Sequence, residues 1–325
     1  MKVLVSGAGG FLGRHAVDRL LARGHVVRAI IRPFSRAPVW HDAVEIFRAD
    51  LRTNGDFTSA FDGIDAVLHL AAATSGGEDV QFASTVVATE RFLEAMVQSS
   101  VKRIVHVSSL VVYDWARTGK IMDEDTPLLN NLYEMGAYTI AKSWQERIVL
   151  RYAKAHSLNL SIMRPGFIWG EKQVQIAGMG RSIGRFYFMF GPLTRLPLCH
   201  VVNCADCLVH ALEKSTAVGE VFNVVDTDDI RVWRYVIEFL RRNDRAGVVV
   251  PIPYRVGLGV AYSASLTSRI LFGRRGKLPS LLTPARFQSQ FKPIRFSNRK
   301  VMQVLGWTPP FNFDQCLDLS FRKPT

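Results

Sequence analysis

The chain has 325 residues, of which 48% are hydrophobic, and it carries a formal net charge of +13. This length exceeds one average domain but suits a single layered sheet with a modest additional lobe. The four cysteines (Cys199, Cys204, Cys207 and Cys316) are too few and too unevenly spaced for a disulfide framework, so we expect buried thiols rather than a metal or redox site. The excess of basic residues indicates attraction to something anionic, with a solvated basic face as the alternative.

A glycine-rich turn follows the first predicted strand. Residues 2–5 form an apolar run of strand length, glycines follow at positions 7, 10 and 13, and residues 14–22 have helical spacing. Gly7 permits a tight turn, Gly10 lets a pyrophosphate approach the backbone, and Gly13 lets the helix pack closely. The N–H groups at the start of the helix would face the diphosphate. The unit predicts a dinucleotide site, and a purely structural turn is the alternative.

Strands and helices alternate along the first half of the chain, which is typical of a parallel sheet. The predicted strands cover 25–31, 44–47, 66–72, 103–107 and 158–164, and the predicted helices cover 56–61, 82–99 and 138–156. Beyond residue 170 the pattern loosens into a helix at 206–213, a strand at 221–225 and a helix at 232–241. We therefore expect an α/β fold with a doubly wound parallel sheet of about seven strands. Residues 1–170 would bind the dinucleotide and residues 171–325 would form a smaller α/β substrate lobe, with the chain crossing back to the first domain.

Three polar residues fall where such a sheet carries chemistry. Ser109 follows the apolar strand 103–107, at the carboxyl end where open α/β sheets bind ligands. Tyr138 and Lys142 are four residues apart in a predicted helix and share one face. A free tyrosine is a poor base at neutral pH, but a nearby ammonium lowers the pKa of its phenol. The three residues predict proton transfer to or from a substrate oxygen, with Tyr138 as acid/base and Ser109 as the hydrogen-bond partner.

Taken in order, these motifs resemble the extended branch of the short-chain dehydrogenase/reductase superfamily, the epimerase/dehydratase-like group. The matching marks extend over nearly the whole chain: the three glycines, Asp50-Leu51, His69 to Ala72, Ser109, Tyr138 with Lys142, Arg164 to Gly166, Asp206 and Leu305 to Trp307. The resemblance implies an NAD(P)-dependent enzyme in which Lys142 also orients the nicotinamide ribose. The cofactor would be bound by Gly7, Gly10, Phe11, Leu12, Gly13, Asp50, Leu51, Leu70, Ala71, Ala72, Tyr138, Lys142, Pro165 and Ile168, without a metal. From the residues alone, Asp50 could equally cap a helix, and His69 fits a satisfied core histidine.

Some stretches depart from the usual pattern of that group. Thr85 and Arg91 stand where relatives carry asparagines, and the loop at 164–171 lacks the asparagine common in enzymes of nucleotide sugars. That loop looks more like those of 3β-hydroxysteroid dehydrogenases and dihydroflavonol reductases. The aromatic run 186–190 would suit an apolar ligand or the core. We expect an oxidoreductase that interconverts an alcohol and a ketone on an apolar, sterol-like substrate. A nucleotide-sugar epimerase or dehydratase and a non-catalytic dinucleotide-binding protein are the alternatives.

The end of the second predicted strand indicates which dinucleotide is bound. Residues 30–36 contain no Asp or Glu that could bind a ribose 2′-OH, whereas Arg32 and Arg36 could hold a 2′-phosphate. We therefore expect NADP(H) rather than NAD. A pair of arginines on a surface loop is the alternative interpretation.

An apolar stretch near the C-terminus bears on location. Residues 248–272 contain no acid and lead into the basic segment 273–277, but prolines and glycines interrupt them too often for a membrane span. Residues 256–272 fit either a helix lying in a membrane interface or a helix packed on its own lobe. The chain starts directly with its first strand, without a signal-like leader, so we expect a cytoplasmic protein. Peripheral membrane contact and a homodimer stay open, and we expect no nucleic-acid partner.

Overall fold

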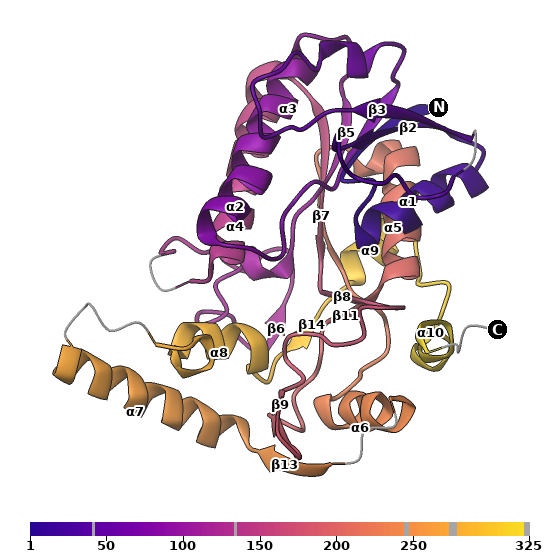
Figure 1. Cartoon of the computed structure of the whole chain (residues 1–325). Coiled ribbons are helices and arrows are strands. Elements are labelled where there is room, and N and C mark those ends of the chain that lie inside the picture. Colours follow the sequence, from indigo (N-terminus) through magenta and orange to yellow (C-terminus); the bar gives the residue numbers. More distant parts are fainter. Residues whose placement is uncertain (41–42, 133–134, 244–246, 273–277, 322–325) are drawn as a thin grey trace.

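The computed structural model describes residues 1–40, 43–132, 135–243, 247–272 and 278–321. Its centre is a seven-stranded sheet, parallel throughout, in the order β12-β7-β5-β4-β1-β2-β3 (Figure 1). The order reverses between β1 and β4, which is the switch point of a doubly wound fold and confirms the expected fold class. The strands are β1 (Lys2–Ser6), β2 (Val26–Ile31), β3 (Val44–Arg48), β4 (Ala66–His69), β5 (Arg103–Val107), β7 (Asn159–Pro165) and β12 (Val221–Val224).

Helices cover both faces of this sheet. One face packs against α1 (Phe11–Ala22), α5 (Val201–Glu213) and α9 (Arg299–Leu305). The other packs against a 3-10 turn (Thr58–Phe61), α3 (Ala88–Val97) and α4 (Ala137–His156). The strand period of two decides which side chain faces which layer: in β1, Val3 and Val5 join the first layer and Leu4 joins the second. All four cysteines are free and buried, as expected.

A smaller lobe lies beyond one end of the sheet (Figure 1). It contains a three-stranded sheet, β13-β10-β9, and its own apolar clusters. The aromatic run 186–190 forms β10, in which Tyr187 and Met189 are buried in that core. The elements of the lobe are β9 (Arg181–Ile183), β10 (Phe186–Phe190), β13 (Val248–Ile252), α6 (Val232–Arg242), α7 (Tyr254–Phe272), α8 (Pro284–Phe291) and α10 (Phe313–Ser320).

Two short parallel pairs connect the lobe to the main sheet. β8 (Phe167–Trp169) pairs with β11 (Leu198–His200), and β6 (Ile121–Met122) pairs with β14 (Arg295–Phe296). The chain then returns: α5 and β12 belong to the large sheet and its layer, and α9 packs on β12. In the part of the chain that the structure describes, no helix has both the length and the apolarity needed to cross a bilayer.

The turn that follows α9 is hydrogen-bonded to α5 and packs in the main core. Gly306 adopts the left-handed conformation (φ +66°) and ends α9, so that Trp307 turns into the main core. The indole Nε1 of Trp307 donates to the Asp206 carboxylate at 2.8 Å, and Arg19 of α1 and Arg23, which directly follows this helix, bind the same carboxylate. These contacts lower the pKa of Asp206 against the opposing effect of burial, which keeps the carboxylate charged.

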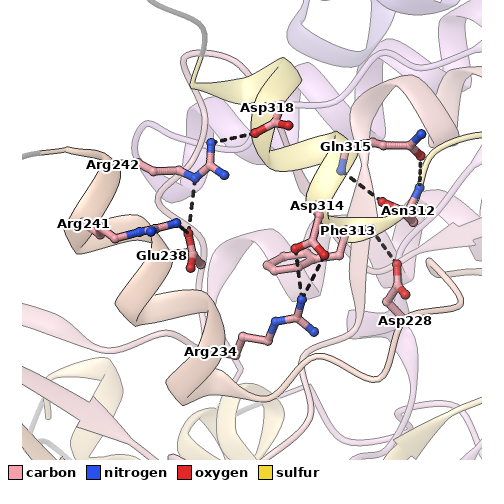
Figure 2. A network of polar contacts seen from close by, with 10 residues as sticks. All are labelled: Asp228, Arg234, Glu238, Arg241, Arg242, Asn312, Phe313, Asp314, Gln315 and Asp318. Atoms are coloured by element: carbon pink, nitrogen blue, oxygen red, sulfur yellow. Dashed lines mark hydrogen bonds and ion pairs between the residues drawn. The ribbon is translucent and has the colours of Figure 1, made fainter.

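Helices α6 and α10 share a buried apolar cluster and are also linked by surface ion pairs (Figure 2). Arg234 binds Asp314 at 3.0 Å and Arg242 binds Asp318 at 2.9 Å. Asn312 caps α10, with its side chain accepting from the Gln315 backbone N–H and the Gln315 side chain accepting from the Asn312 N–H. Pairs this exposed each contribute little, so the buried apolar contacts of the lobe carry most of its stability.

Two predicted helices differ from the structure. The segment 56–61 forms only a single 3-10 turn, opened by Asp56, whose carboxylate accepts from the N–H and hydroxyl of Thr58. The segment 82–99 is interrupted by a π-helical turn (Ala83–Val87) between α2 (Glu78–Phe82) and α3. This turn places the buried hydroxyl of Thr85 where it accepts from the Ala73 N–H at 3.0 Å. Such interruptions are frequent at functional sites.

Candidate active site

The glycine turn is shaped by close backbone contacts. Gly7 has φ +72°, and a Cβ there would lie 2.8 Å from the Ala71 backbone nitrogen. A Cβ on Gly13 would lie 2.1 Å from the Gly7 carbonyl oxygen, so α1 can approach β1 this closely only without a side chain. Among the described residues no side chain caps α1, and its first turn contains no acid. This helix end therefore offers free N–H donors to an anion, which fits the diphosphate of a dinucleotide.

A single cavity of about 1230 Å³ runs along the carboxyl edge of the sheet from this turn. The structure brings every sequence-predicted site residue to its wall. These are Gly7, Gly10, Phe11, Leu12, Gly13, Arg32, Arg36, Asp50, Leu51, Leu70, Ala71, Ala72, Ser109, Tyr138, Lys142, Pro165 and Ile168. The residues of the β10 aromatic run are absent from the described lining. Tyr187 and Met189 are buried in the core of the lobe and Phe190 packs against the cluster around Phe287, whereas Phe186 is exposed.

Ser109 and Tyr138 lie next to each other on the wall of the cavity. Ser109 follows β5 directly, and its hydroxyl accepts from the Val111 N–H at the start of a short 3-10 turn. Tyr138 lies in the first turn of α4, and its side chain hydrogen-bonds to Ser109. Burial raises the pKa of Tyr138, and the bond to Ser109 opposes that rise. The phenol therefore holds its proton at neutral pH.

Lys142 is buried one turn further along α4. Its Nζ donates to the Val107 carbonyl and to Gln145 Oε1, both at 2.6 Å. Burial lowers the pKa of Lys142 to about 7, while the charge of Glu146 acts in the opposite direction. An ammonium has three donors, so two are used by the protein and a third can serve a ligand. The described hydrogen bonds of the Lys142 ammonium therefore go to Val107 and Gln145 and not to the Tyr138 phenol.

Gln145 connects this lysine to a chain of buried polar groups. Its amide donates to Thr89 Oγ1 at 2.7 Å, which lies 2.9 Å from His69 Nε2. His69 Nδ1 is 2.7 Å from Ser6 Oγ, which accepts two backbone N–H groups of the loop after β4. Burial and the charge of Lys142 lower the pKa of His69 to about 3, so the imidazole is neutral. His69 is thus a satisfied core histidine, as its place in an apolar strand indicated.

Arginines surround the far end of the cavity, where β2 and β3 end. Arg32 and Arg36 are exposed on the loop after β2, and Arg48 shapes that loop by donating to the carbonyls of Arg32 (3.2 Å) and Ser35 (2.6 Å). The Asp50 carboxylate accepts from Arg52 Nε at 2.9 Å and from a terminal nitrogen of the same side chain at 2.7 Å. These bonds lower the pKa of Asp50, which therefore stays charged and paired.

A buried ion pair fixes α4 to the sheet. Arg164 of β7 donates to both carboxylate oxygens of Glu146, and both side chains are about 5% exposed or less. Arg164 also donates to the Tyr113 hydroxyl at 2.8 Å, which in turn donates to Asn223 Oδ1 at 2.8 Å. The helix that carries Tyr138 and Lys142 is therefore held at a defined distance from β7.

Several residues at the site were missed by sequence reasoning. Gln145 lies three positions after Lys142 and so shares its helix face, a spacing that could have drawn attention to it. Arg48 and Arg52 lie at the end of the cavity where β2 and β3 end, and no motif in the surrounding sequence predicted that position. Arg286, Ser289 and Gln290 of α8 also line the cavity, although they lie more than a hundred residues from Ile168, the nearest predicted site residue in the sequence. Within the described residues no three of His, Cys, Asp and Glu gather as a metal site would require.

The fold and the cavity define a dinucleotide-binding α/β enzyme of the short-chain dehydrogenase/reductase type. The chain belongs to the NAD-dependent epimerase/dehydratase family, whose model matches residues 3–224. That family contains NAD-dependent dehydrogenases and epimerases, so the chain is an oxidoreductase or an epimerase of this kind.

The similar proteins include both oxidoreductases and epimerases. The chain is 28% identical to a 3β-hydroxysteroid dehydrogenase/Δ5→4-isomerase of Mycobacterium tuberculosis, over 97% of this chain and 88% of the relative. It is 26% identical to 4-hydroxy-2-methyl-3-oxo-4-farnesyl-3,4-dihydroquinoline-1-oxide ketoreductase of Stigmatella aurantiaca, over 98% and 95%. A structure of UDP-glucuronic acid 4-epimerase from Bacillus cereus, with UDP-glucuronic acid and NAD bound, superposes with a TM-score of 0.73 at 20% identity, over 99% of this chain and 98% of that one. This last likeness shows the fold alone.

Proposed function

We propose that the protein is an NADP(H)-dependent oxidoreductase that interconverts an alcohol and a ketone on an apolar, sterol-like substrate. The observation that carries the proposal is the pairing of the Ser109 and Tyr138 side chains on the cavity wall, with Lys142 one helical turn away. A protein that only bound a dinucleotide would have no use for this arrangement. The non-catalytic alternative is therefore the weakest of the three.

The division of roles follows from the contacts. Bound NADP(H) would supply or accept the hydride. Tyr138 would donate a proton to the substrate oxygen in reduction and remove it in oxidation, and Ser109 would donate a hydrogen bond to the same oxygen. Lys142, held by Gln145 and the Val107 carbonyl, would offer its remaining donor to a ribose hydroxyl, and its charge would stabilise the phenolate.

Apolar side chains in the lining of the cavity favour an apolar substrate. Val111, Met135, Phe167 and Ile176 all contribute to the cavity wall. Desolvating apolar surface is the main driving force that such a wall can provide. Relatives named as steroid dehydrogenases and as a ketoreductase of a farnesylated quinoline support the same substrate class. Epimerisation or dehydration of a nucleotide sugar is the second candidate, favoured by the fold shared with UDP-sugar enzymes.

The choice of NADP(H) rests on the arginines after β2. Arg32 and Arg36 line the cavity, and residues 30–36 provide no carboxylate to bind a ribose 2′-OH. The nearest acid at this edge, Asp50, is already bound by Arg52. Two guanidinium groups in this position suit a 2′-phosphate, which accepts charge-assisted hydrogen bonds. The family description and the structural neighbours name NAD, so direct comparison of the two cofactors is needed.

Catalysis is tested with Tyr138→Phe, compared with Tyr152→Phe as a matched control. Tyr152 is on the same helix and packs beside His156, away from the cavity. NADPH consumption with hydrophobic ketones and turnover of nucleotide sugars would be measured side by side. We expect Tyr138→Phe to lower kcat by about a hundredfold to ten-thousandfold, with cofactor affinity nearly unchanged and the control active. Full activity of Tyr138→Phe would refute the assignment, and turnover of nucleotide sugars alone would favour the second candidate.

Cofactor choice is tested by titrating NADPH and NADH into the wild type, Arg32→Ala and Arg151→Ala. Arg151 is an exposed arginine on α4 paired with Glu90, so its removal controls for the lost positive charge. We expect Arg32→Ala to weaken NADPH binding by about tenfold or more, with NADH binding little changed. A wild-type preference for NADH, or an unchanged NADPH affinity in Arg32→Ala, would contradict the proposal.

A further inference from the structure

Helix α7 exposes an unusual amount of apolar surface. Six of its large hydrophobic side chains are more than half exposed: Val256, Val260, Tyr262, Leu266, Ile270 and Leu271. Ile270 is 73% exposed and Leu266 is 61% exposed. Figure 1 shows α7 running along the edge of the small lobe that lies farthest from the main sheet. So many exposed large hydrophobic side chains on one helix usually mark a contact with a partner or a membrane.

The opposite face of α7 is fully packed. Ala261 is buried against α8, and the ring of Phe287 lies so close to Gly257 that a Cβ there would be 2.4 Å away. Tyr254 stacks on the same ring, with centroids 5.9 Å apart. The buried and exposed positions alternate with helical period, so the exposed face is fixed by packing and is not a frayed end. Helix α7 therefore packs against the lobe with one face and exposes apolar side chains on the other.

The stretch of sequence that contains α7 carries charge of one sign. Residues 245–313 contain eleven Lys and Arg and no Asp or Glu. Two of them, Arg255 and Arg269, are exposed on α7 itself, on the same side of the helix as Tyr262. The basic segment 273–277, which follows α7 in the sequence, lies outside the described residues. An apolar helix face bordered by cations is complementary to a surface with an apolar interior and anionic groups at its edge.

We propose that α7 lies in the interface of an anionic lipid membrane, with Leu266 and Ile270 inserted and Arg255 and Arg269 at the level of the headgroups. The neighbouring sheet extends the same edge, since Ile183 of β9 and Val248 of β13 are 62% and 52% exposed. A second copy of this chain is a poorer occupant, because a twofold contact would bring two acid-free faces together. Insertion of this kind requires no membrane-spanning helix.

Contact of α7 with a membrane would also affect how a substrate enters the cavity. Helix α8 packs on α7 through Phe287 and Phe291, while Arg286 and Gln290 of the same helix line the cavity. A membrane-bound α7 would place this wall of the cavity close to the lipid, from which an apolar substrate could enter. This consequence rests on the proposed function, whereas the docking itself does not.

The test is co-sedimentation of the full chain with vesicles of phosphatidylcholine, with and without phosphatidylserine, at low and high salt. We expect binding only to the vesicles with phosphatidylserine, weakened by salt. The double variant L266E/I270E should bind about tenfold more weakly or worse, because two apolar side chains are lost from the inserted face. The matched control, V26E/L150E, adds the same two charges at exposed hydrophobic positions in β2 and α4. It should bind nearly as the wild type does, and thermal unfolding of both variants checks their folding.

Three outcomes would overturn the docking proposal. One is no binding of the wild type to acidic vesicles at low salt. Another is equal loss of binding in both double variants, which would show that net charge alone is responsible. The third is a dimer in light scattering that L266E/I270E converts to a monomer without any lipid binding, which would make α7 an interface between copies. None of these readouts uses activity, so failure of the proposed function would leave the result interpretable.

Discussion

Replacing Glu146 by glutamine should be among the most damaging single changes in this protein. The Glu146 carboxylate and the Arg164 guanidinium form a two-point ion pair with side chains only 2% and 5% exposed. Arg164 also lies over the ring of Tyr113, 4.7 Å from its centroid. The introduced amide would keep one acceptor for Arg164 but would leave the guanidinium charge buried without compensation. The damage therefore comes from the stranded cation rather than from the lost contact itself.

The magnitude follows from this geometry. Breaking a buried ion pair on one side costs about 3–5 kcal/mol of unfolding free energy. For a chain of this size each kcal/mol lowers Tm by roughly 2 °C, so we expect a decrease of about 6–10 °C. The charge of Glu146 also raises the pKa of Lys142. Its removal should move the pKa of Lys142 below about 7, so that less of the lysine is charged at neutral pH and activity recovers as the pH is lowered.

Thermal and urea unfolding would measure the stability change, with Glu90→Gln as the control. Glu90 pairs with Arg151 at 3.0 Å, but these side chains are 40% and 66% exposed, so the control should cost less than about 1 kcal/mol. The double variant E146L/R164M removes both charges and should recover most of the loss. If E146Q were no less stable than the control, the reasoning about the buried cation would be wrong.

Three further predictions concern single residues. Gln145→Leu removes an acceptor from Lys142 and should shift the alkaline limb of the kcat–pH profile to lower pH, whereas Gln145→Glu should restore it; unchanged profiles would show that Gln145 only packs. Gly13→Ala places a Cβ against the Gly7 carbonyl and should abolish cofactor binding measured by calorimetry, whereas Gly119→Ala, with nothing within 4 Å, should bind normally. Trp307→Phe loses the bond from Nε1 to Asp206 and should cost about 1–3 kcal/mol in urea unfolding; an unchanged midpoint would mean that the arginines alone hold Asp206.

The main sheet could be predicted from the sequence because its central strands are buried on both faces, whereas the edge strand β3 is largely exposed. Such central strands appear as mainly apolar runs, as in residues 103–107, and the glycine spacing identified the first crossover. The position of Ser109 followed from the same logic, since it comes directly after a strand. Local sequence could not reveal the π-helical turn before α3 or the short turn at 58–61, because residues distant in sequence bind to both: Ala73 donates to Thr85, and Arg28 of β2 donates to the carbonyls of Ser59, Ala60 and Asp62.

The sequence predicted many of the residues that line the cavity, but it missed Gln145, Arg52 and the residues of α8, and it did not predict how the side chains are hydrogen-bonded. The spacing of Tyr138 and Lys142 placed them on one helix face and suggested direct electrostatic contact. The Lys142 ammonium instead donates to the Val107 carbonyl and to Gln145, because a buried charged group is stable only when protein acceptors replace the water that it has lost. The wall contributed by α8 depends on how the small lobe folds back over the sheet. No local pattern encodes that placement.

The ties of Trp307 to the first half of the chain bear on how this protein can be re-engineered. The family model ends at residue 224, which invites grafting the remainder from a relative with another substrate. A graft made there would also replace α9 and Trp307, which fill the core against α5 and β12 and bind Asp206. A chimera should therefore exchange only 226–297 and keep the host's residues from Asn298 onward. Such an exchange would change the part of the cavity wall that α8 contributes, with Arg286, Ser289 and Gln290, while the contacts of Trp307 that stabilise the sheet stay with the host.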